Sequence, residues 1–270
     1  KILIKNTNMD SSKPIMVKNL SVLFNGDRTK HLHVLKDISF SLEEDSFVTI
    51  IGPSGCGKST LFRLISGLPT KDSCEIGGEI KIFGKGPEVA SEGREIGLIL
   101  QKPTLLEWRT VEKNMQLPLE IMGYGDEKSK KIVKNILKVL ELEQFSHYRP
   151  SELSGGMQQK VSIGRALAYN PELLLMDEPF AALDEVNRRK MNDEIIRIWK
   201  ELKKTILFVT HNIQEAVYLS QHVIVLSKKP SEVYKIVDIN LEYPRSKVEG
   251  SNKYFTYIKE IREYLNEASA

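Results

Sequence analysis

Short apolar runs alternate along the chain with stretches in which apolar residues repeat at helical spacing. The short runs predict β-strands at residues 15–17, 21–24, 38–42, 47–51, 79–83, 96–100, 173–176, 206–210 and 223–226. The run 47–51 is continuously apolar or β-branched, as expected for a strand that is buried on both faces. Strands that alternate with helices predict an α/β fold, with a largely parallel sheet covered by helices on both faces.

The helical periodicity divides the chain into segments. Residues 102–165 are helical in pattern, and apolar residues near the C-terminus repeat as on an amphipathic helix. Residues 1–13 are polar and lack a clear period. We therefore expect a flexible segment at 1–13, a domain at 14–245 with a helical subdomain inserted at about 102–165, and a C-terminal amphipathic helix at 246–270.

Composition limits the class of protein. Lys and Arg number 39 against 36 Asp and Glu, and a net charge of +3 is too balanced to indicate a nucleic-acid partner. The two cysteines, Cys56 and Cys74, offer neither a disulfide framework nor a metal cluster, which fits a reducing cytosol. No apolar run approaches the roughly 20 residues that span a bilayer, and no signal-peptide pattern begins the chain. Any membrane-spanning partner is therefore expected to be another polypeptide.

A glycine-rich stretch between an expected strand and an expected helix has the spacing of a phosphate-binding loop. Its glycines let backbone N–H groups turn toward phosphate oxygens, and the helix that follows adds its positive dipole end. Lys58 is suited to neutralise the β- and γ-phosphates, and the Ser59 hydroxyl to ligate Mg²⁺. A glycine-rich turn with a chance lysine is the alternative, and the strand–loop–helix setting disfavours it. The nucleotide-binding residues predicted here are Gly52, Pro53, Ser54, Gly55, Cys56, Gly57, Lys58, Ser59 and Thr60.

Cys56 is a special case within this loop. It lies near a helix N-terminus and Lys58, a setting that favours a reactive thiolate. We expect a maleimide to inactivate the protein and MgATP to protect it. An inert, shielded small residue is the alternative.

Two acidic residues, Asp177 and Glu178, end the apolar run 173–176. The carboxyl end of a parallel sheet is where ligands bind. Asp177 is suited to hold Mg²⁺ through water, and Glu178 to polarise the attacking water. Acids that merely cap a strand-to-loop junction are the alternative, which the upstream phosphate loop makes the weaker one.

A second anion site is predicted where Ser154, Gly155 and Gly156 open another helix. Two glycines and a hydroxyl at a helix start favour anion binding, although Ser154 is equally suited to cap the helix. The chain has one phosphate loop and one separate anion site. This arrangement predicts that the γ-phosphate is captured between two subunits.

Together these motifs resemble the ATP-binding subunit of ABC transporters, from about residue 15 to residue 244. The resemblance implies a P-loop NTPase fold of the RecA-like type, in which an antiparallel β subdomain and an inserted α-helical subdomain adjoin the parallel core. It implies ATP and Mg²⁺ as cofactors and a homodimer as the working unit. It implies that Gln101 contacts Mg²⁺ and water and reports to the membrane partner, that Asp184 lies in the loop between the two sites, and that His211 contacts the γ-phosphate.

The residues assigned by motif and resemblance form three sets. The catalytic set is Glu178, His211, Gln101 and Lys58. The metal set is Ser59, Gln101 and Asp177. The nucleotide set adds Phe24, Ser154, Gly155, Gly156 and Asp184 to the phosphate loop. Phe24 is chosen for adenine stacking because it ends a strand-like run before the loop. His31 or His33 could stack on adenine instead, and Phe24 could simply pack in the β layer.

Residues 103–114, which read Pro-Thr-Leu-Leu-Glu-Trp-Arg-Thr-Val-Glu-Lys-Asn, resemble the nitrate/sulfonate/taurine import branch of that family. Importers of pyrimidine precursors or riboflavin share the signal, and Trp108 packed in a helical core is an alternative to Trp108 at a contact surface. The resemblance implies a peripheral subunit on the cytoplasmic face of the membrane, bound to permease subunits and indirectly to a solute-binding protein. An exporter ATPase subunit and a non-transport ABC ATPase are the alternative functions.

Overall fold

The computed structural model describes residues 13–25, 31–69 and 74–269 of the 270-residue chain. The segment expected to be flexible therefore lies outside the described residues, except for Lys13. The Lys13 carbonyl accepts a hydrogen bond from the Phe83 N–H at 3.1 Å, and its ammonium lies 2.7 Å from a Glu43 carboxylate oxygen.

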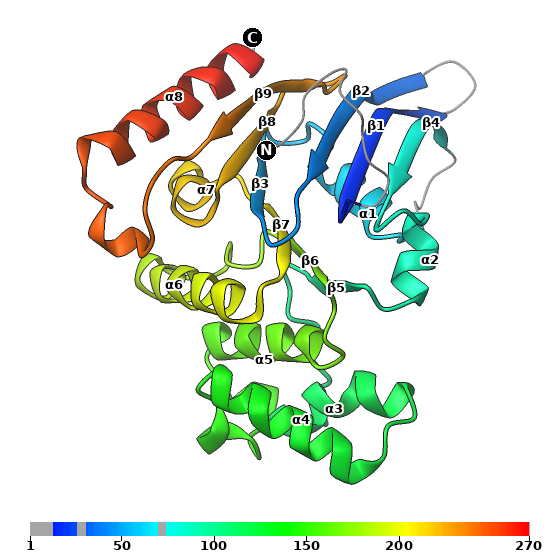
Figure 1. Cartoon of the computed structure of the whole chain (residues 1–270), viewed down its shortest axis with the longest axis vertical. Helices are drawn as coiled ribbons and strands as arrows, with labels where there is room; N and C mark the ends of the chain where they lie inside the picture. Colours follow the sequence, from blue (N-terminus) through cyan, green and yellow to red (C-terminus); the bar gives the residue numbers. More distant parts are fainter. Residues whose placement is uncertain (1–12, 26–30, 70–73, 270) are drawn as a thin grey trace.

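A six-stranded sheet occupies the centre of the molecule in the order β5-β6-β7-β3-β8-β9 (Figure 1). Its strands are β3 (Phe47–Ile51), β5 (Ile96–Ile99), β6 (Leu173–Asp177), β7 (Thr205–Val209), β8 (His222–Leu226) and β9 (Val233–Asp238). The first five strands of that order are parallel and β9 is antiparallel at the edge. The predicted α/β fold with a mostly parallel sheet is confirmed. β9 escaped prediction because its residues are mostly exposed or half-buried, which leaves a weak apolar pattern.

A separate antiparallel sheet has the order β2-β1-β4, built from β1 (Ile15–Asn25), β2 (His31–Leu42) and β4 (Cys74–Lys81). The two runs predicted at 15–17 and 21–24 form one strand, because the chain continues through an irregularity at Asn19, where φ is 48°. The strand predicted at 79–83 begins earlier, so that Gly77 and Gly78 lie inside β4 although paired glycines often form a turn. A Cβ on Gly78 would overlap the Asn19 carbonyl.

The helices cover both sheets. They are α1 (Lys58–Ile65), α2 (Pro87–Glu92), α3 (Val111–Ile121), α4 (Asp126–Val139), α5 (Gly155–Leu167), α6 (Glu185–Leu202), α7 (Ile213–Leu219) and α8 (Asn252–Ser269), with short 3-10 turns η1 (Glu143–Phe145), η2 (Pro150–Glu152) and η3 (Arg245–Lys247). Within the range expected to be a helical subdomain, α3 and α4 pack on α5 and form a layer beyond the β5–β6 side of the sheet (Figure 1). Among the described residues, no helix is both long and apolar enough to cross a membrane.

The C-terminal helix starts later than residue 246. Gly250 has φ 88°, and the Ser251 hydroxyl accepts a hydrogen bond from the Tyr254 N–H at 3.2 Å, so the α-helix begins at Asn252. Its buried residues Tyr254, Ile258 and Ile261 face α7 and β8.

Alternate residues of β3 point into two different cores. Phe47 and Ile51 join the core beneath α5 to α8. Val48 and Ile50 join the core shared with α1 and the antiparallel sheet. The loop that follows β3 therefore emerges between two packed layers, which hold its backbone in place.

Candidate functional site

The predicted phosphate loop joins β3 to α1 at the carboxyl end of the parallel strands, the edge where ligands bind in such sheets. Gly57 is the N-cap of α1, with φ 112°, and no side chain caps the helix. The first-turn N–H groups have no intrahelical acceptor and suit an anion. The Lys58 ammonium donates to the carbonyls of Gly52 at 2.8 Å and Pro53 at 3.0 Å, which places its charge over the same loop.

The loop is closely packed on one side and open on the other. A Cβ on Gly57 would lie 2.8 Å from a Val34 methyl, and a Cβ on Gly52 would lie 2.9 Å from the Cys56 sulfur. Gly55, with φ 74°, has no other heavy atom within 4 Å of its Cβ position. The packed side fixes the loop while the open side leaves room for a ligand, so the residues present fit the phosphates of a nucleotide.

The structure contradicts the expectation that Cys56 is an accessible, reactive thiol. Its side chain is 1% exposed, and its sulfur packs beside Gly52. The shielded alternative is correct because the loop turns the side chain inward while its backbone remains at the surface of the site.

Ser231 supports the loop and was missed by the sequence analysis. Its buried hydroxyl shares its single hydrogen between the carbonyls of Cys56, at 2.5 Å, and Ser227, at 2.7 Å. Its N–H donates to the Val34 carbonyl at 2.9 Å, and its carbonyl accepts from the Lys36 N–H at 2.8 Å. Ser231 therefore ties β2 to the phosphate loop, a contact between distant segments that no local sequence pattern marks.

The two predicted acids lie where β6 ends. Burial and the neighbouring Glu178 raise the pKa of Asp177, while Lys58 and Arg63 oppose that rise. The charge of Lys58 therefore acts on the Asp177 carboxyl at this end of the sheet. A nearby cation stabilises a carboxylate, and carboxylate and hydroxyl oxygens are ligands that Mg²⁺ takes. The assignment of Asp177 and Ser59 to Mg²⁺ stays a prediction.

Glu178 and His211 lie side by side although 33 positions separate them. Glu178 has φ 44°, a left-handed conformation that is uncommon for a residue with a side chain. Its N–H donates to the Val209 carbonyl at 2.9 Å, which anchors it to the end of β7. The Glu178 Oε2 and His211 Nδ1 atoms are 3.0 Å apart. The pair exists because β6 and β7 are neighbours in the sheet.

The second predicted anion site lies in the helical layer. Ser154 is the N-cap of α5, and its hydroxyl accepts from the Met157 N–H at 3.3 Å. A Cβ on Gly155 would find only Leu183 within 4 Å, at 3.7 Å. Asp184 is the N-cap of α6. Its carboxylate accepts a hydrogen bond from the Asn187 N–H, which lowers the pKa of Asp184. Figure 1 shows α5 and α1 in different layers, so one chain does not bring this site to its own phosphate loop.

The segment after Gln101 is tied to α5. Gln101 is exposed just beyond β5. The Gln159 side chain donates to the Leu100 carbonyl at 3.2 Å, and the Arg165 guanidinium donates to the carbonyls of Pro103 and Thr104, each at 2.9 Å. These bonds connect the chain on both sides of Gln101 to the helix that Ser154 begins. Arg165 was not singled out from the sequence, because a helical arginine carries no local signal of this bond.

Trp108 is 73% exposed, which excludes the alternative that it packs in a helical core. Buried Asn114 shapes the loop that presents it, since its side chain bonds the Leu106 N–H at 2.8 Å and the Arg109 carbonyl at 3.1 Å. The Arg109 guanidinium lies 2.7 Å from a Glu120 carboxylate oxygen. The indole ring therefore projects from an ordered loop.

Phe24 is half-buried at the end of β1 and packs against the core shared with α1. Its role in adenine stacking stays a prediction, as does that of His33, which pairs with Leu23 across the antiparallel sheet. The side chain of His31 lies outside the described part of the chain.

Comparisons with known proteins agree with these motifs. The profile of the ABC transporter family matches residues 35–181. An uncharacterized ABC transporter ATP-binding protein of Methanocaldococcus jannaschii is 43% identical over 257 residues, covering 94% of this chain and 91% of the relative. An aliphatic sulfonates import ATP-binding protein of Bacillus cereus is 42% identical, covering 83% and 86%. A taurine import ATP-binding protein of Pelagibacter ubique is 34% identical, covering 93% and 90%.

Solved structures agree as well. A dimeric ATP-binding cassette in a post-hydrolysis state with ADP and phosphate superposes with a TM-score of 0.71 at 32% identity, covering 84% of this chain and 100% of the other. The cbiO1 protein of Clostridium perfringens, part of the ABC transporter complex cbiONQ, has a TM-score of 0.74 at 24% identity over 92% of this chain and 99% of the other, a likeness of fold.

Proposed function

Since the chain belongs to the ABC transporter family of ATP-binding proteins, we propose that it hydrolyses ATP to drive import of a small solute through a separate membrane permease. The observation that carries the proposal is the Glu178–His211 pair, 3.0 Å apart, at the same sheet edge as the phosphate loop. An acid suited to activate water and a histidine suited to contact phosphate meet there, beside a loop built for the phosphates.

The reaction follows from these positions. The loop N–H groups and Lys58 bind the phosphates. The water oxygen attacks the γ-phosphorus in line while the Glu178 carboxylate accepts a proton from that water. The bond between the γ-phosphorus and the β–γ bridging oxygen breaks, which releases ADP and phosphate. His211 steadies the γ-phosphate oxygens. Mg²⁺, when bound by Ser59, Gln101 and Asp177, supplies positive charge that offsets the charge on the phosphates.

A second copy of the chain completes the site. Ser154, Gly155 and Gly156 of one protomer close over the nucleotide held by the other, with Asp184 between the two sites. The separation of α5 from α1 within one chain supports this arrangement, and so does the similar cassette solved as a dimer. Exposed Trp108 and Arg109 are proposed to contact the permease, since an aromatic ring and a guanidinium are common anchors of protein contacts.

The proposed solute is a sulfonate such as taurine or an alkanesulfonate, as in the names of the similar import proteins. The subunit is proposed to lie at the cytoplasmic face of the membrane. A solute-binding protein outside the membrane would deliver the solute to the permease.

Replacing Glu178 with Gln tests the chemistry. The variant keeps the shape of the side chain and loses the base, so turnover should fall by roughly 10²–10⁴-fold, while ATP binding survives and an ATP-bound dimer accumulates on size exclusion. Lys58→Ala is the contrasting variant and should weaken nucleotide binding itself. Near-normal hydrolysis by Glu178→Gln would remove Glu178 from its role.

The solute class needs a separate test. The subunit would be co-purified with its permease and solute-binding protein, and ATPase activity in liposomes would be measured with taurine, an alkanesulfonate and nitrate. Stimulation by sulfonates alone supports the proposed class, and stimulation by nitrate alone contradicts it.

A further inference from the structure

Glu215 is a buried acid close to the site that the proposed chemistry does not use. It lies in the first turn of α7 and is 5% exposed. Its Oε2 atom accepts a hydrogen bond from the hydroxyl of Thr210, which is itself 2% exposed. Thr210 directly precedes His211, so the Glu215 carboxyl reaches back from the helix to the end of β7.

The residues around His211 form a closed set of hydrogen bonds. The Thr210 hydroxyl accepts from the Asn212 N–H at 3.1 Å, so its single hydrogen is free to go to Glu215. The Asn212 side chain in turn accepts from the Glu215 N–H at 3.2 Å. His211 is the residue between Thr210 and Asn212. With both neighbours held, its side chain is directed outward, 62% exposed, toward Glu178.

Arg188 lines the same groove as Glu215 and is bonded to the segment that follows Glu178. Burial raises the pKa of Glu215 to about 7, and the charge of Arg188 is among the influences that oppose the rise. Arg188 in turn donates to the carbonyls of Phe180 at 3.4 Å and Leu183 at 2.7 Å. The Glu215 carboxyl thus bonds the segment that ends in His211 through Thr210. Arg188, which lines the same groove as Glu215, bonds the segment that follows Glu178.

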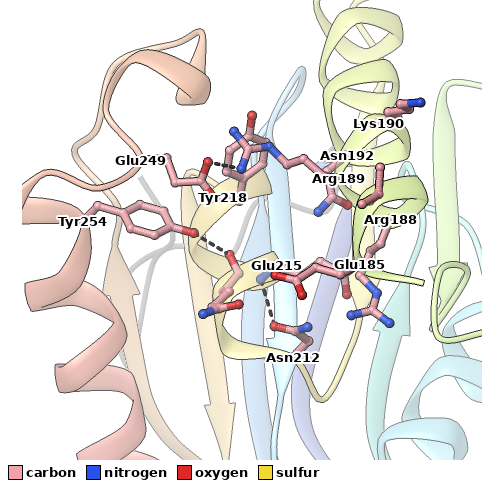
Figure 2. Close-up of a pocket in the computed structure, with 12 residues that line it drawn as sticks. Glu185, Arg188, Arg189, Lys190, Asn192, Asn212, Glu215, Tyr218, Glu249 and Tyr254 are labelled. Atoms are coloured by element: carbon pink, nitrogen blue, oxygen red, sulfur yellow. Dashed lines mark hydrogen bonds and ion pairs between the residues drawn. The ribbon is translucent and has the colours of Figure 1, made fainter. Parts of the chain in front are cut away.

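The other side of the Glu215 carboxyl faces a groove of about 420 Å³ between α6, α7 and α8. Figure 2 shows Glu215 beside Arg188 and Asn212 at one end of this groove, with Tyr254 at the α8 side. The Oε1 atom of Glu215 has no hydrogen-bond partner among the described residues. The carboxyl is therefore anchored by one oxygen, through Thr210, rather than by a full set of structural bonds.

We propose that Glu215 is a positioning residue for ATP hydrolysis, holding His211 opposite Glu178 through the Thr210 hydroxyl. The inference rests on the proposed function of Glu178 and His211. In this role Glu215 does not contact the nucleotide. Its loss should slow turnover without weakening binding, because the phosphate loop and Lys58 are untouched.

Three variants and a control test this role. Glu215→Leu and Thr210→Val each remove the bond, and we expect each to lower kcat for MgATP by about 10- to 100-fold, since a misplacement of about 1 Å costs as much. KM should stay within about twofold. Glu215→Gln keeps an acceptor for the Thr210 hydroxyl and should retain most of the activity. Tyr254→Phe is the matched control, because it loses a bond to the Gln214 carbonyl on the same helical turn but does not touch Thr210.

Epistasis separates positioning from general damage. If Glu215 acts through His211, Glu215→Leu should lower the small residual rate of His211→Ala by less than about twofold. A full 10-fold loss in that background, or an unchanged kcat in folded Glu215→Leu, overturns the proposal. Should Glu215→Leu fail to fold, Thr210→Val carries the same comparison. Loss of activity in Glu178→Gln beside normal activity in both bond-removing variants would leave the proposed function standing and reject the positioning role.

Discussion

The buried carboxyl of Glu215 should make the stability of the folded chain depend on pH. Its pKa is raised from 4.5 to about 7 by burial. The folded state therefore holds a proton that the unfolded state releases, and the stabilising contribution is full below about pH 4.5 and is lost as the pH rises through about 7. Each unit of difference between the folded and unfolded pKa corresponds to about 1.36 kcal/mol. The free energy of unfolding that Glu215 contributes therefore falls by about 3 kcal/mol by pH 8.

Glu215→Gln removes this titration while preserving the size of the side chain. Urea denaturation at pH 5 and pH 8 would give the free energy of unfolding of both proteins. From pH 5 to pH 8, the free energy of unfolding of the variant should rise by about 2 to 3 kcal/mol relative to that of the wild type. Glu185→Gln, at the exposed rim of the same groove, reports the effect of removing one negative charge there. A gain in Glu215→Gln that does not exceed that of the control would refute the reasoning, as would a gain of opposite sign.

Three other variants probe separate contacts. Trp108→Ala should leave the thermal melt and the basal ATPase of the isolated subunit unchanged, because the ring is 73% exposed, and should reduce co-purification with the permease; a normal melt with normal permease binding contradicts the assigned surface. Gly57→Ala should abolish tight nucleotide binding in a titration with labelled ATP and lower the free energy of unfolding by about 1–3 kcal/mol. The reason is that φ is 112° and the added Cβ would lie 2.8 Å from a Val34 methyl. Wild-type affinity would show that the loop relaxes freely. Ser231→Ala leaves the buried Cys56 carbonyl without its hydroxyl donor, so the free energy of unfolding should fall by about 1–3 kcal/mol, and KM for ATP should rise; a change in neither would show that the bond does not order the loop.

Local pattern was sufficient for much of the fold. Nearly continuous apolar or β-branched runs predicted the buried strands β3, β6, β7 and β8, because a strand buried on both faces favours such residues at every position. The antiparallel sheet was harder. β1 continues through Asn19, and Gly77 and Gly78 lie inside β4, since pairing across the sheet outweighs the local tendency of glycine to turn.

The candidate site divides in the same way. The phosphate loop and the acids after β6 were predictable because their chemistry requires residues adjacent in the chain. Glu215, Arg165 and Ser231 were not, because each acts on a segment distant from its own sequence neighbours or through a bond that residue type alone does not reveal. The burial of Cys56 was decided by the packing of the loop, although its sequence setting equally favoured a reactive thiol.

The sequence by itself determined which chemical groups the protein has and the order of its strands and helices along the chain. Only the tertiary structure decided which groups meet. Glu178 and His211 are paired because β6 and β7 are hydrogen-bonded neighbours, and the helix start at Ser154 lies in a different layer from α1. The physical reason is that periodicity records how each residue is buried, whereas the pairing of strands and the packing of layers depend on contacts between segments that the local pattern does not contain.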